Sequence, residues 1–152
     1  MNSEFCVAVH GLVFLNLKGQ CLSSEALAEN ICTNPARVRK VMAKLKKAGL
    51  VSTKEGSDGG YSLEKAAGEI SLRQVSGALE IQFVSSHWRS GSQDMDCMVA
   101  SGMADVMDYI YSGLDALCQK RLEAVTIADV SGMLVEKNQG KKLGCSDSQQ
   151  TS

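Results

Sequence analysis

The sequence has few prolines, histidines and aromatic residues, and it contains no long apolar run. Two histidines and the absence of any Cys-x-x-C pair leave too few closely spaced ligands for a common zinc site. No run approaches the roughly 18 apolar residues that a membrane-spanning helix needs. The apolar N-terminal stretch carries Glu4 and no leading Lys or Arg, which is typical of an amphipathic helix rather than a signal peptide. We therefore expect a cytoplasmic protein with no membrane partner and no metal or other cofactor.

The overall charge and the cysteine content narrow the range of possible functions further. The formal net charge is −1, so a nucleic-acid site has to be a local patch rather than a property of the whole surface. The chain has six cysteines and is 44% hydrophobic, and in a cytosolic protein with a good core such cysteines are more often free thiols than disulfides. A small thiol enzyme is the alternative from another class, but the chain has no convincing nucleophile–base pair. We therefore predict that the protein is not an enzyme.

One stretch of the chain, residues 31–54, is strongly basic. It holds seven basic residues and no acidic one, whereas residues 90–119 hold five aspartates and no Lys or Arg. A helix is predicted from Asn34-Pro35 to Gly49, because proline is favoured in a first turn and apolar residues recur at i, i+3, i+4 and i+7. These predicted buried residues are Val38, Val41, Met42 and Leu45. A basic face is often merely solvated, but charge of one sign along this whole stretch favours a DNA-binding face.

The remaining patterns predict a mainly α-helical protein with one small β-hairpin. Ser23, the pair Ser71 and Gln74, and the pair Thr126 and Asp129 are typical of helix starts. The glycine-rich run GSDGG between two short β-type runs predicts the hairpin. The predicted order is helix 3–17, helix 24–30, helix 35–48, strands 50–53 and 61–63, helix 72–80, loop 84–96, helix 97–122 and helix 127–137.

Two short helices, of which the second is basic, followed by a hairpin are the order of a winged helix-turn-helix. The second helix of this motif lies in the major groove of DNA, with its N-terminal residues facing base edges. Arg37 and Arg39, or Lys40, are predicted to read bases, since arginine pairs bidentately with guanine, and the later lysines, including Lys46, suit phosphates. The predicted DNA-binding set is Ser24, Thr33, Asn34, Ala36, Arg37, Arg39, Lys40, Lys44, Lys47, Lys54, Ser57, Asp58, Gly59, Gly60 and Tyr61.

Three runs, SSEALAENICTNPARVRKVMAKLKKAGLV, GSDGGYSL and ISLRQVSGALE, resemble the IscR/NsrR/CymR family of winged-helix transcriptional regulators (the Rrf-two family). The resemblance covers roughly residues 1–137. It implies a homodimer joined through the long helix and bound to a two-fold symmetric operator on double-stranded DNA, usually as a repressor. A second copy would cover the apolar face of that helix. The predicted dimerisation residues are Met103, Val106, Met107, Ile110, Leu114 and Leu117.

We therefore expect three parts in the chain. Residues 1–83 form a winged helix-turn-helix DNA-binding domain. Residues 84–137 form a loop, a long dimerisation helix and a closing helix. Residues 138–152 are polar and form a disordered tail.

Many members of the resembled family hold an iron–sulfur cluster with three cysteines in the loop before the long helix, and this sequence has only Cys97 there. Since such a cluster needs several thiolates together, we expect none here. In the family's dimer that loop lies close to the partner's DNA-binding part. The lack of the three grouped cysteines favours thiol sensing instead. In this hypothesis, Cys32 of one subunit and Cys97 of the other form a disulfide, or one of the two is oxidised alone. We expect Asp94 and Asp96 to raise the pKa of Cys97.

Other interpretations stay open. In one alternative, the same repressor is controlled by a partner protein or a small metabolite. In another, the protein is an architectural DNA binder without sequence preference. Cys6 and Cys118 are expected to be small core residues. His10 is expected to be a packed or capping residue. His87 and Trp88 are expected to anchor the loop on a hydrophobic surface, or else to line an effector pocket.

Overall fold

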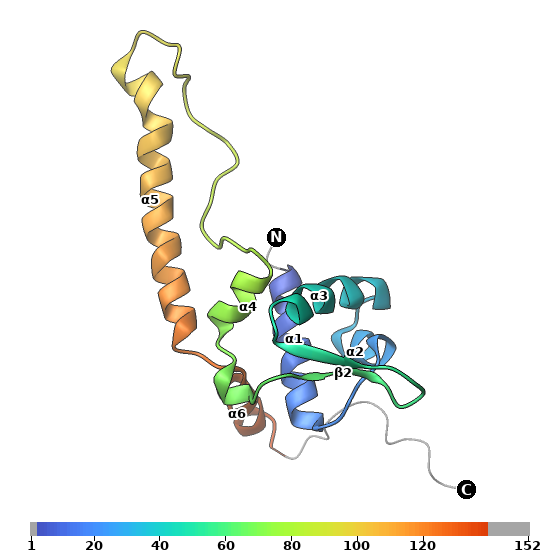
Figure 1. Ribbon diagram of the computed structural model, residues 1–152. Coiled ribbons are helices and arrows are strands. Elements are labelled where there is room, and N and C mark those ends of the chain that lie inside the picture. The colour runs from blue at the N-terminus through green and yellow to red at the C-terminus, as the bar shows by residue number, and fades with distance from the viewer. Residues whose placement is uncertain (1–2, 140–152) are drawn as a thin grey trace, which may run out of the picture.

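The computed structural model describes residues 3–139. It confirms a mainly helical protein with a two-stranded antiparallel hairpin (Figure 1). The predicted disordered tail lies outside the described residues from residue 140 onward. The elements in chain order are α1 (Ser3–Lys18), α2 (Ser24–Ile31), α3 (Pro35–Lys47), β1 (Val51–Lys54), β2 (Gly60–Leu63), the 3-10 helix η1 (Ala67–Glu69), α4 (Leu72–Ala78), α5 (Met98–Glu123) and α6 (Ile127–Lys137).

The starts of four helices are fixed by side chains that accept hydrogen bonds from first-turn amides. The Ser23 hydroxyl accepts from the amide of Ala26 at 3.1 Å, and Asn34 accepts from the amide of Arg37 at 2.8 Å. Helices α4 and α6 begin with the predicted capping boxes. These caps satisfy amides that have no partner inside a helix, so the short helices begin where the sequence predicts. Helix α4 ends at Ala78, two residues before the predicted end, and η1 was not predicted.

The end of α3 turns the chain into the hairpin. Gly49 has a φ of 76°, its amide donates to the Lys46 carbonyl at 3.0 Å, and the Leu50 amide donates to the Leu45 carbonyl at 3.0 Å. This pair of hydrogen bonds is the Schellman motif, and it uses a glycine because only glycine adopts a positive φ without a steric cost. Leu45 and Leu50 are both buried beside the turn, so the end of α3 is anchored in the core.

The hairpin is fastened to the loop between α1 and α2. β1 pairs with β2 from Val51 opposite Leu63 to Lys54 opposite Gly60. Tyr61 of β2 then exchanges two backbone hydrogen bonds with Leu22, at 3.0 and 2.8 Å. Gly60 has a φ of 148°, and a Cβ there would lie 2.4 Å from the Leu22 carbonyl oxygen. The glycine is therefore required for the hairpin to approach this loop.

The hydrophobic core lies around α1 and the inner face of α3. The four predicted residues of the α3 stripe, Val38, Val41, Met42 and Leu45, are all fully buried. Gly11 of α1 faces them closely, since a Cβ at this position would lie 2.6 Å from the Met42 methyl carbon. Helix α1 packs against α2, α3, α4 and α6. We call residues 3–81 together with α6 the body of the molecule.

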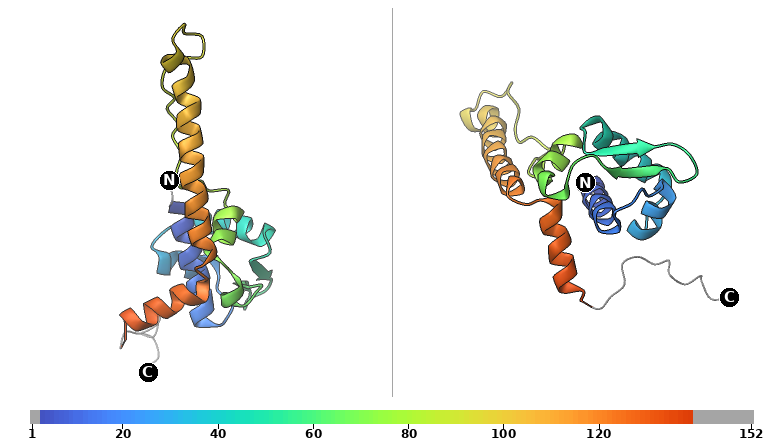
Figure 2. Two further views of the ribbon diagram at one scale, coloured as in Figure 1. Left: turned by 90° about the vertical axis from the view of Figure 1, so that its left-hand side faces the viewer. Right: turned by 60° about the horizontal axis from the view of Figure 1, so that its bottom comes forward.

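The segment 82–123, which we call the arm, is built differently. Helix α5 extends away from the body, and the chain before it runs back along the helix (Figure 1 and Figure 2). None of the 26 residues of α5 is buried. Helix α5 packs mainly against α4 near its C-terminal end. No helix in the part of the chain that the structure describes is long and apolar enough to span a bilayer.

The loop before α5 contains no helix or strand, as predicted, but polar contacts fasten it to the helix. The amides of Phe83 and Val84 donate to one Asp115 carboxylate oxygen at 2.7 and 3.1 Å. Further along, the Arg89 guanidinium pairs with two aspartates of α5, Asp105 and Asp108. The expectation that Trp88 anchors the loop is wrong, because its side chain is 76% exposed. An ionic contact beside it provides the anchor instead.

Candidate nucleic-acid interface

The outward face of α3 combines small residues with cations. Ala36, Lys40, Ala43 and Lys47 follow one another at helical spacing, and all four are exposed on the side opposite the buried stripe. The two alanines leave the helix backbone accessible, and the two lysines supply positive charge around them. Such a face can enter a groove of DNA closely without steric obstruction.

Some of the predicted DNA-binding cations are paired inside the chain. Arg39 donates to the Ser24 hydroxyl at 3.2 Å and lies 3.6 Å from the Glu25 carboxylate. Lys40 and Lys44 both approach Glu4 of α1, with Nζ–Oε distances of 3.4 and 2.8 Å. The contacts form two sets, one of Arg39 with Ser24 and Glu25, and one of Lys40 and Lys44 with Glu4.

Other cations of the set have different surroundings. Arg37 is half-buried on the flank of α3, and its guanidinium makes no hydrogen bond or ion pair with any residue between 3 and 139. Lys46 donates to the Thr53 hydroxyl of β1 at 2.8 Å. Lys47 and Lys54 are exposed and have no ion-pair partner within the described chain. These two lysines are therefore free to meet an external anion.

The turn between α2 and α3 contains a strained cysteine. Cys32 has φ 62° and ψ 50°, a left-handed conformation in which most residues other than glycine are disfavoured. The amides of Cys32 and Thr33 donate to the carbonyls of Glu29 and Ala28, at 3.3 and 2.9 Å, and so close the end of α2. The thiol is exposed and lies 3.7 Å from the Glu29 carbonyl oxygen. Asn34 then follows as the N-cap of α3, so the predicted set members Thr33 and Asn34 shape the turn.

The hairpin tip supplies exposed residues, while its base is structural. Lys54, Ser57 and Asp58 are exposed at the tip. A Cβ at Gly59 would lie 2.1 Å from the Lys54 carbonyl oxygen, so Gly59 is needed for the turn itself, whereas Gly60 permits the contact with Leu22. Tyr61 is half-buried and packs against the core.

The cysteines of the described chain are all free, and Cys145 lies outside it. Cys97 is the exposed N-cap of α5 and makes no regular capping hydrogen bond. The nearby amides of Ala100 and Val99 nevertheless hold the pKa of its thiol below the ordinary value. The expectation that neighbouring aspartates raise this pKa is therefore wrong. The expectation of core positions is also wrong for Cys6, which is exposed, and Cys118 is only half-buried.

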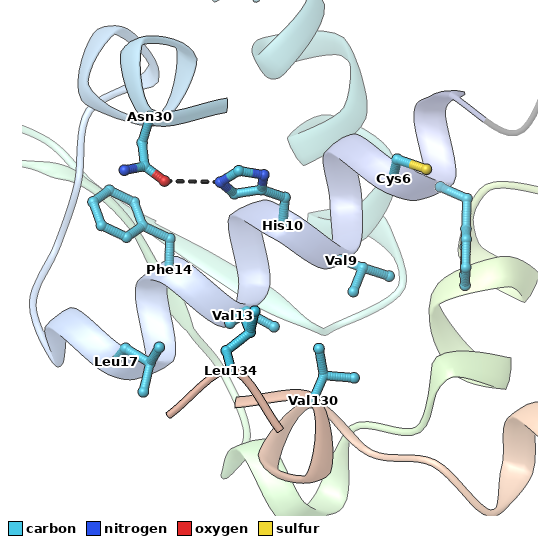
Figure 3. A pocket seen from close by; sticks show the side chains of 10 residues that line it. Cys6, Val9, His10, Val13, Phe14, Leu17, Asn30, Val130 and Leu134 are labelled. Carbon is cyan, nitrogen blue, oxygen red and sulfur yellow. Dashed lines mark hydrogen bonds between the residues drawn. The ribbon is translucent and has the colours of Figure 1, made fainter. Parts of the chain in front are cut away.

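A groove with a volume of about 470 Å³ runs along α1 beside α6 (Figure 3). Its walls are mainly apolar, and its polar rim is formed by His10 and Asn30, whose Nε2 and Oδ1 atoms are 2.8 Å apart. His10 is therefore an exposed, hydrogen-bonded residue rather than a packed one. The sequence does not predict this groove, although Phe5, Val9 and Val13 recur at a four-residue spacing along one side of α1.

The sequence pattern of the Rrf2 family, described as an iron-dependent transcriptional regulator, matches residues 1–132. YwnA of Bacillus subtilis (strain 168), which is named as an HTH-type transcriptional regulator, is 28% identical over 136 residues, covering 88% of this chain and 98% of YwnA. A second Bacillus subtilis protein named in the same way, YwgB, is 36% identical over 59 residues, covering 39% of this chain and 38% of YwgB.

Solved structures show the same fold. A transcriptional regulator from Lactobacillus plantarum superposes with a TM-score of 0.77 at 22% identity, covering 92% of this chain and 93% of that one. CymR, the global cysteine regulator of Bacillus subtilis, superposes with a TM-score of 0.62 at 18% identity, covering 88% and 96%. At these identities the similarity establishes a winged helix-turn-helix fold with a long C-terminal helix.

The matched family is described as iron-dependent, which implies a metal site. Iron–sulfur clusters need several thiolates at one place. Among residues 3–139, no three His, Cys, Asp or Glu side chains come together in a way that holds a metal ion. A single chain, as far as it is described, therefore does not offer the donor set that iron needs.

Proposed function

From the premise that the chain belongs to the Rrf2 family of transcriptional regulators, we propose that it is a homodimeric repressor of a two-fold symmetric DNA operator. The family assignment establishes a DNA-binding transcription regulator rather than an enzyme. The observation that carries the rest of the proposal is the outward face of α3, where small residues alternate with exposed cations. In this proposal α3 enters the major groove and the hairpin tip lies beside the backbone.

Within α3, the exposed position of Arg39 favours it as the base reader over the half-buried Arg37. Ser24 and Glu25 contact only the Nη1 atom of Arg39, so they orient the guanidinium and leave its other nitrogens for a base edge, which reduces the entropy lost on docking. Phosphate contacts are assigned to the exposed cations without internal partners, and Arg37 is assigned to the flanking backbone. The proposed phosphate contacts are Arg37, Lys47 and Lys54.

Dimerisation through α5 is supported by the lack of any buried residue in a 26-residue helix that carries an apolar stripe. Val106, Ile110, Leu114 and Leu117 are all exposed at helical spacing. A second copy of the chain would cover this stripe and place two α3 helices on successive turns of DNA, roughly 34–36 Å apart. In this proposal the body is the DNA-binding domain and the arm holds the dimer together.

The test of this function compares binding to the DNA beside the protein's own gene with binding to random DNA of equal length. A specific regulator is expected to prefer its operator by roughly 10³-fold or more at physiological salt. Size-exclusion chromatography with light scattering, run on the same samples, reports the oligomeric state. Equal affinity for both duplexes would instead indicate a sequence-blind architectural DNA binder.

We further propose that thiol oxidation controls DNA binding without an iron–sulfur cluster. Cys97 is exposed with a lowered pKa, and Cys32 is exposed in the turn that leads into α3. Cys97 begins α5 at its end remote from the body, so the proposed disulfide joins Cys32 of one subunit to Cys97 of the other. In this step hydrogen peroxide takes two electrons and two protons from two thiols, giving one disulfide and two waters. A rearranged turn would change the separation of the two α3 helices.

Mild peroxide treatment followed by non-reducing electrophoresis tests the switch. We expect a dimer-sized band and loss of operator binding in the wild type, and neither change in Cys32→Ser or Cys97→Ser. If oxidant leaves both the band pattern and the DNA affinity of the wild type unchanged, thiol control is excluded.

The groove between α1 and α6 favours a second candidate for the control step, a small apolar metabolite. Its volume is in the range of ligand pockets, and His10 and Asn30 offer polar groups at its rim. This candidate predicts that the double variant with serine at Cys32 and Cys97 responds to the natural signal as the wild type does. Loss of the response in that variant would favour thiol control.

A further inference from the structure

One acidic residue lies against the cations of the recognition helix α3. The carboxylate of Glu4, in the first turn of α1, is 2.8 Å from the Lys44 ammonium and 3.4 Å from that of Lys40. The side chain of Glu4 is only 27% exposed, so its pairing is less screened by solvent than that of a fully exposed ion pair. Lys44 and the nearby Lys40 hold the pKa of Glu4 below its ordinary value.

The two lysines that pair with Glu4 would otherwise be available to DNA phosphates. Lys40 belongs to the outward face of α3, and Lys44 lies one turn further along. A lysine near a DNA backbone releases counterions when it contacts a phosphate, and this sequence-independent term supplies nearly all non-specific affinity. A carboxylate that is already paired with two lysines therefore reduces the contribution of counterion release to non-specific DNA affinity.

We propose that Glu4 withholds Lys40 and Lys44 from DNA phosphates and thereby limits the affinity of the protein for arbitrary DNA. The carboxylate of Glu4 takes the place that a phosphate oxygen would take beside both ammonium groups. Removal of the carboxylate frees two cations for each subunit, and each then contacts the backbone of any sequence. This inference rests on the proposed binding of DNA through α3, and it assigns a negative contribution to a residue outside that helix.

The ordinary alternative is a purely structural role for Glu4. An acidic residue in the first turn of a helix stabilises that helix, and an ion pair between α1 and α3 would hold the two helices together. In that case Glu4→Gln lowers the thermal stability and leaves the affinity for DNA unchanged or weaker. Only the withholding role therefore predicts tighter binding of the variant to DNA.

The experiment measures the affinity of full-length wild type and Glu4→Gln for a random-sequence duplex between about 50 and 200 mM salt. Glu4→Gln is expected to bind on the order of tenfold more tightly at low salt. The slope of log K against log salt is expected to steepen by about 0.9 for each lysine released to a phosphate. Glu136→Gln is the matched control, because Glu136 lies exposed on α6 in the body and the variant makes the same change in net charge.

A second pair of variants protects the test against a folding artefact. Glu4→Ala removes the carboxylate without leaving an amide to hold the lysines, and it is expected to behave as Glu4→Gln does. In the double variant Glu4→Gln with Lys44→Gln, the slope is expected to fall back by about 0.9 relative to Glu4→Gln alone. Circular dichroism melting on each variant confirms that the comparison is made between folded proteins.

The outcomes separate this inference from the proposed function. If folded Glu4→Gln and Glu4→Ala bind random DNA no more tightly than the wild type, Glu4 does not withhold the lysines and the inference fails alone. If neither wild type nor variant shows salt-dependent binding to any duplex, the proposed function fails as well. A wild type that shows no operator preference, together with a tighter Glu4→Gln, would leave the inference standing and overturn only the sequence-specific function.

Discussion

The body buries its hydrophobic side chains, whereas the arm leaves those of α5 exposed. In the body, Leu12, Val41, Met42 and Ile70 are fully buried by neighbours from the same chain. In the arm, the 26 residues of α5 include no buried side chain, and polar contacts hold the preceding loop in place. The body thus buries its own core within one chain, whereas the apolar stripe of α5 stays exposed, which is the basis of the proposed dimer.

The largest expected effect concerns the body. Leu12→Ala removes a side chain that is fully buried in the core, and we expect a loss of about 2–5 kcal/mol in the free energy of unfolding. Leu117→Ala in the arm removes an exposed side chain of the same type and is expected to cost less than about 0.5 kcal/mol in a dilute, monomeric sample. Urea denaturation at low protein concentration measures both. Equal losses would show that α5 is stabilised within one chain after all.

The next effect tests what covers the arm. Ile110→Asp places a charge on the exposed apolar stripe of α5, and we expect a monomer by light scattering. The loss of a second linked binding site is expected to weaken operator binding by about 10²-fold or more. Ser112→Asp introduces the same charge on another face of α5 and serves as the control. A dimeric Ile110→Asp variant would place the dimer interface elsewhere.

A smaller effect separates two kinds of contact on the body. Arg39→Ala is expected to cost about 1–3 kcal/mol on the operator and little on random DNA, because arginine reads a base edge in the proposed complex. Lys47→Ala is expected to weaken binding to all DNA about equally. Fluorescence anisotropy with both duplexes checks the pair. Uniform weakening by Arg39→Ala would make that arginine a phosphate contact.

A smaller difference between the two regions is expected in the reactivity of their thiols. Cys97 in the arm has a lowered pKa, so a larger fraction of it is thiolate at pH 7 than of an ordinary thiol. We expect iodoacetamide to label Cys97 several times faster than the exposed Cys6 of the body at neutral pH. Peptide mass spectrometry over time measures the two rates. Slower labelling at Cys97 would mean that its surroundings hinder the thiolate more than the helix amides favour it.

The smallest expected effect concerns the strained turn in the body. Cys32→Gly places a residue that tolerates a positive φ at a position with φ 62°, and we expect a gain of up to about 1 kcal/mol in stability. Thr33→Gly, at the next position, has no left-handed backbone to relieve and is expected to destabilise the protein. Thermal melting compares the two variants, and a destabilised Cys32→Gly variant would contradict the assignment of strain to this residue.

Local features of the structure were predictable because their causes lie within a few residues. The caps at Ser23, Asn34, Ser71 and Thr126 each bond to an amide in the following turn, so the sequence alone indicates where those helices begin. The buried stripe of α3 was predictable for the same reason, since helical periodicity is a local property.

Features that depend on distant contacts were not predictable. Lys44 pairs with Glu4, 40 residues earlier in the chain, only because α1 and α3 pack together. The periodicity of α1 indicates an apolar face, but it does not say which part another element covers, and Cys6 therefore proved exposed. For Cys97, the sequence indicated the nearby charges, whereas the backbone amides of α5 determine the direction of the pKa shift.

The length of α5 gives the molecule a mechanical property. With a rise of about 1.5 Å per residue, its 26 residues form a rod of roughly 39 Å that is joined to the body near one end. A rotation of about 5° at that joint moves the far end by roughly 3 Å, close to the rise of one base pair along DNA. Within the proposed dimer, α5 would therefore act as a lever, which converts a small rearrangement at α4 into a displacement on the scale of one base pair.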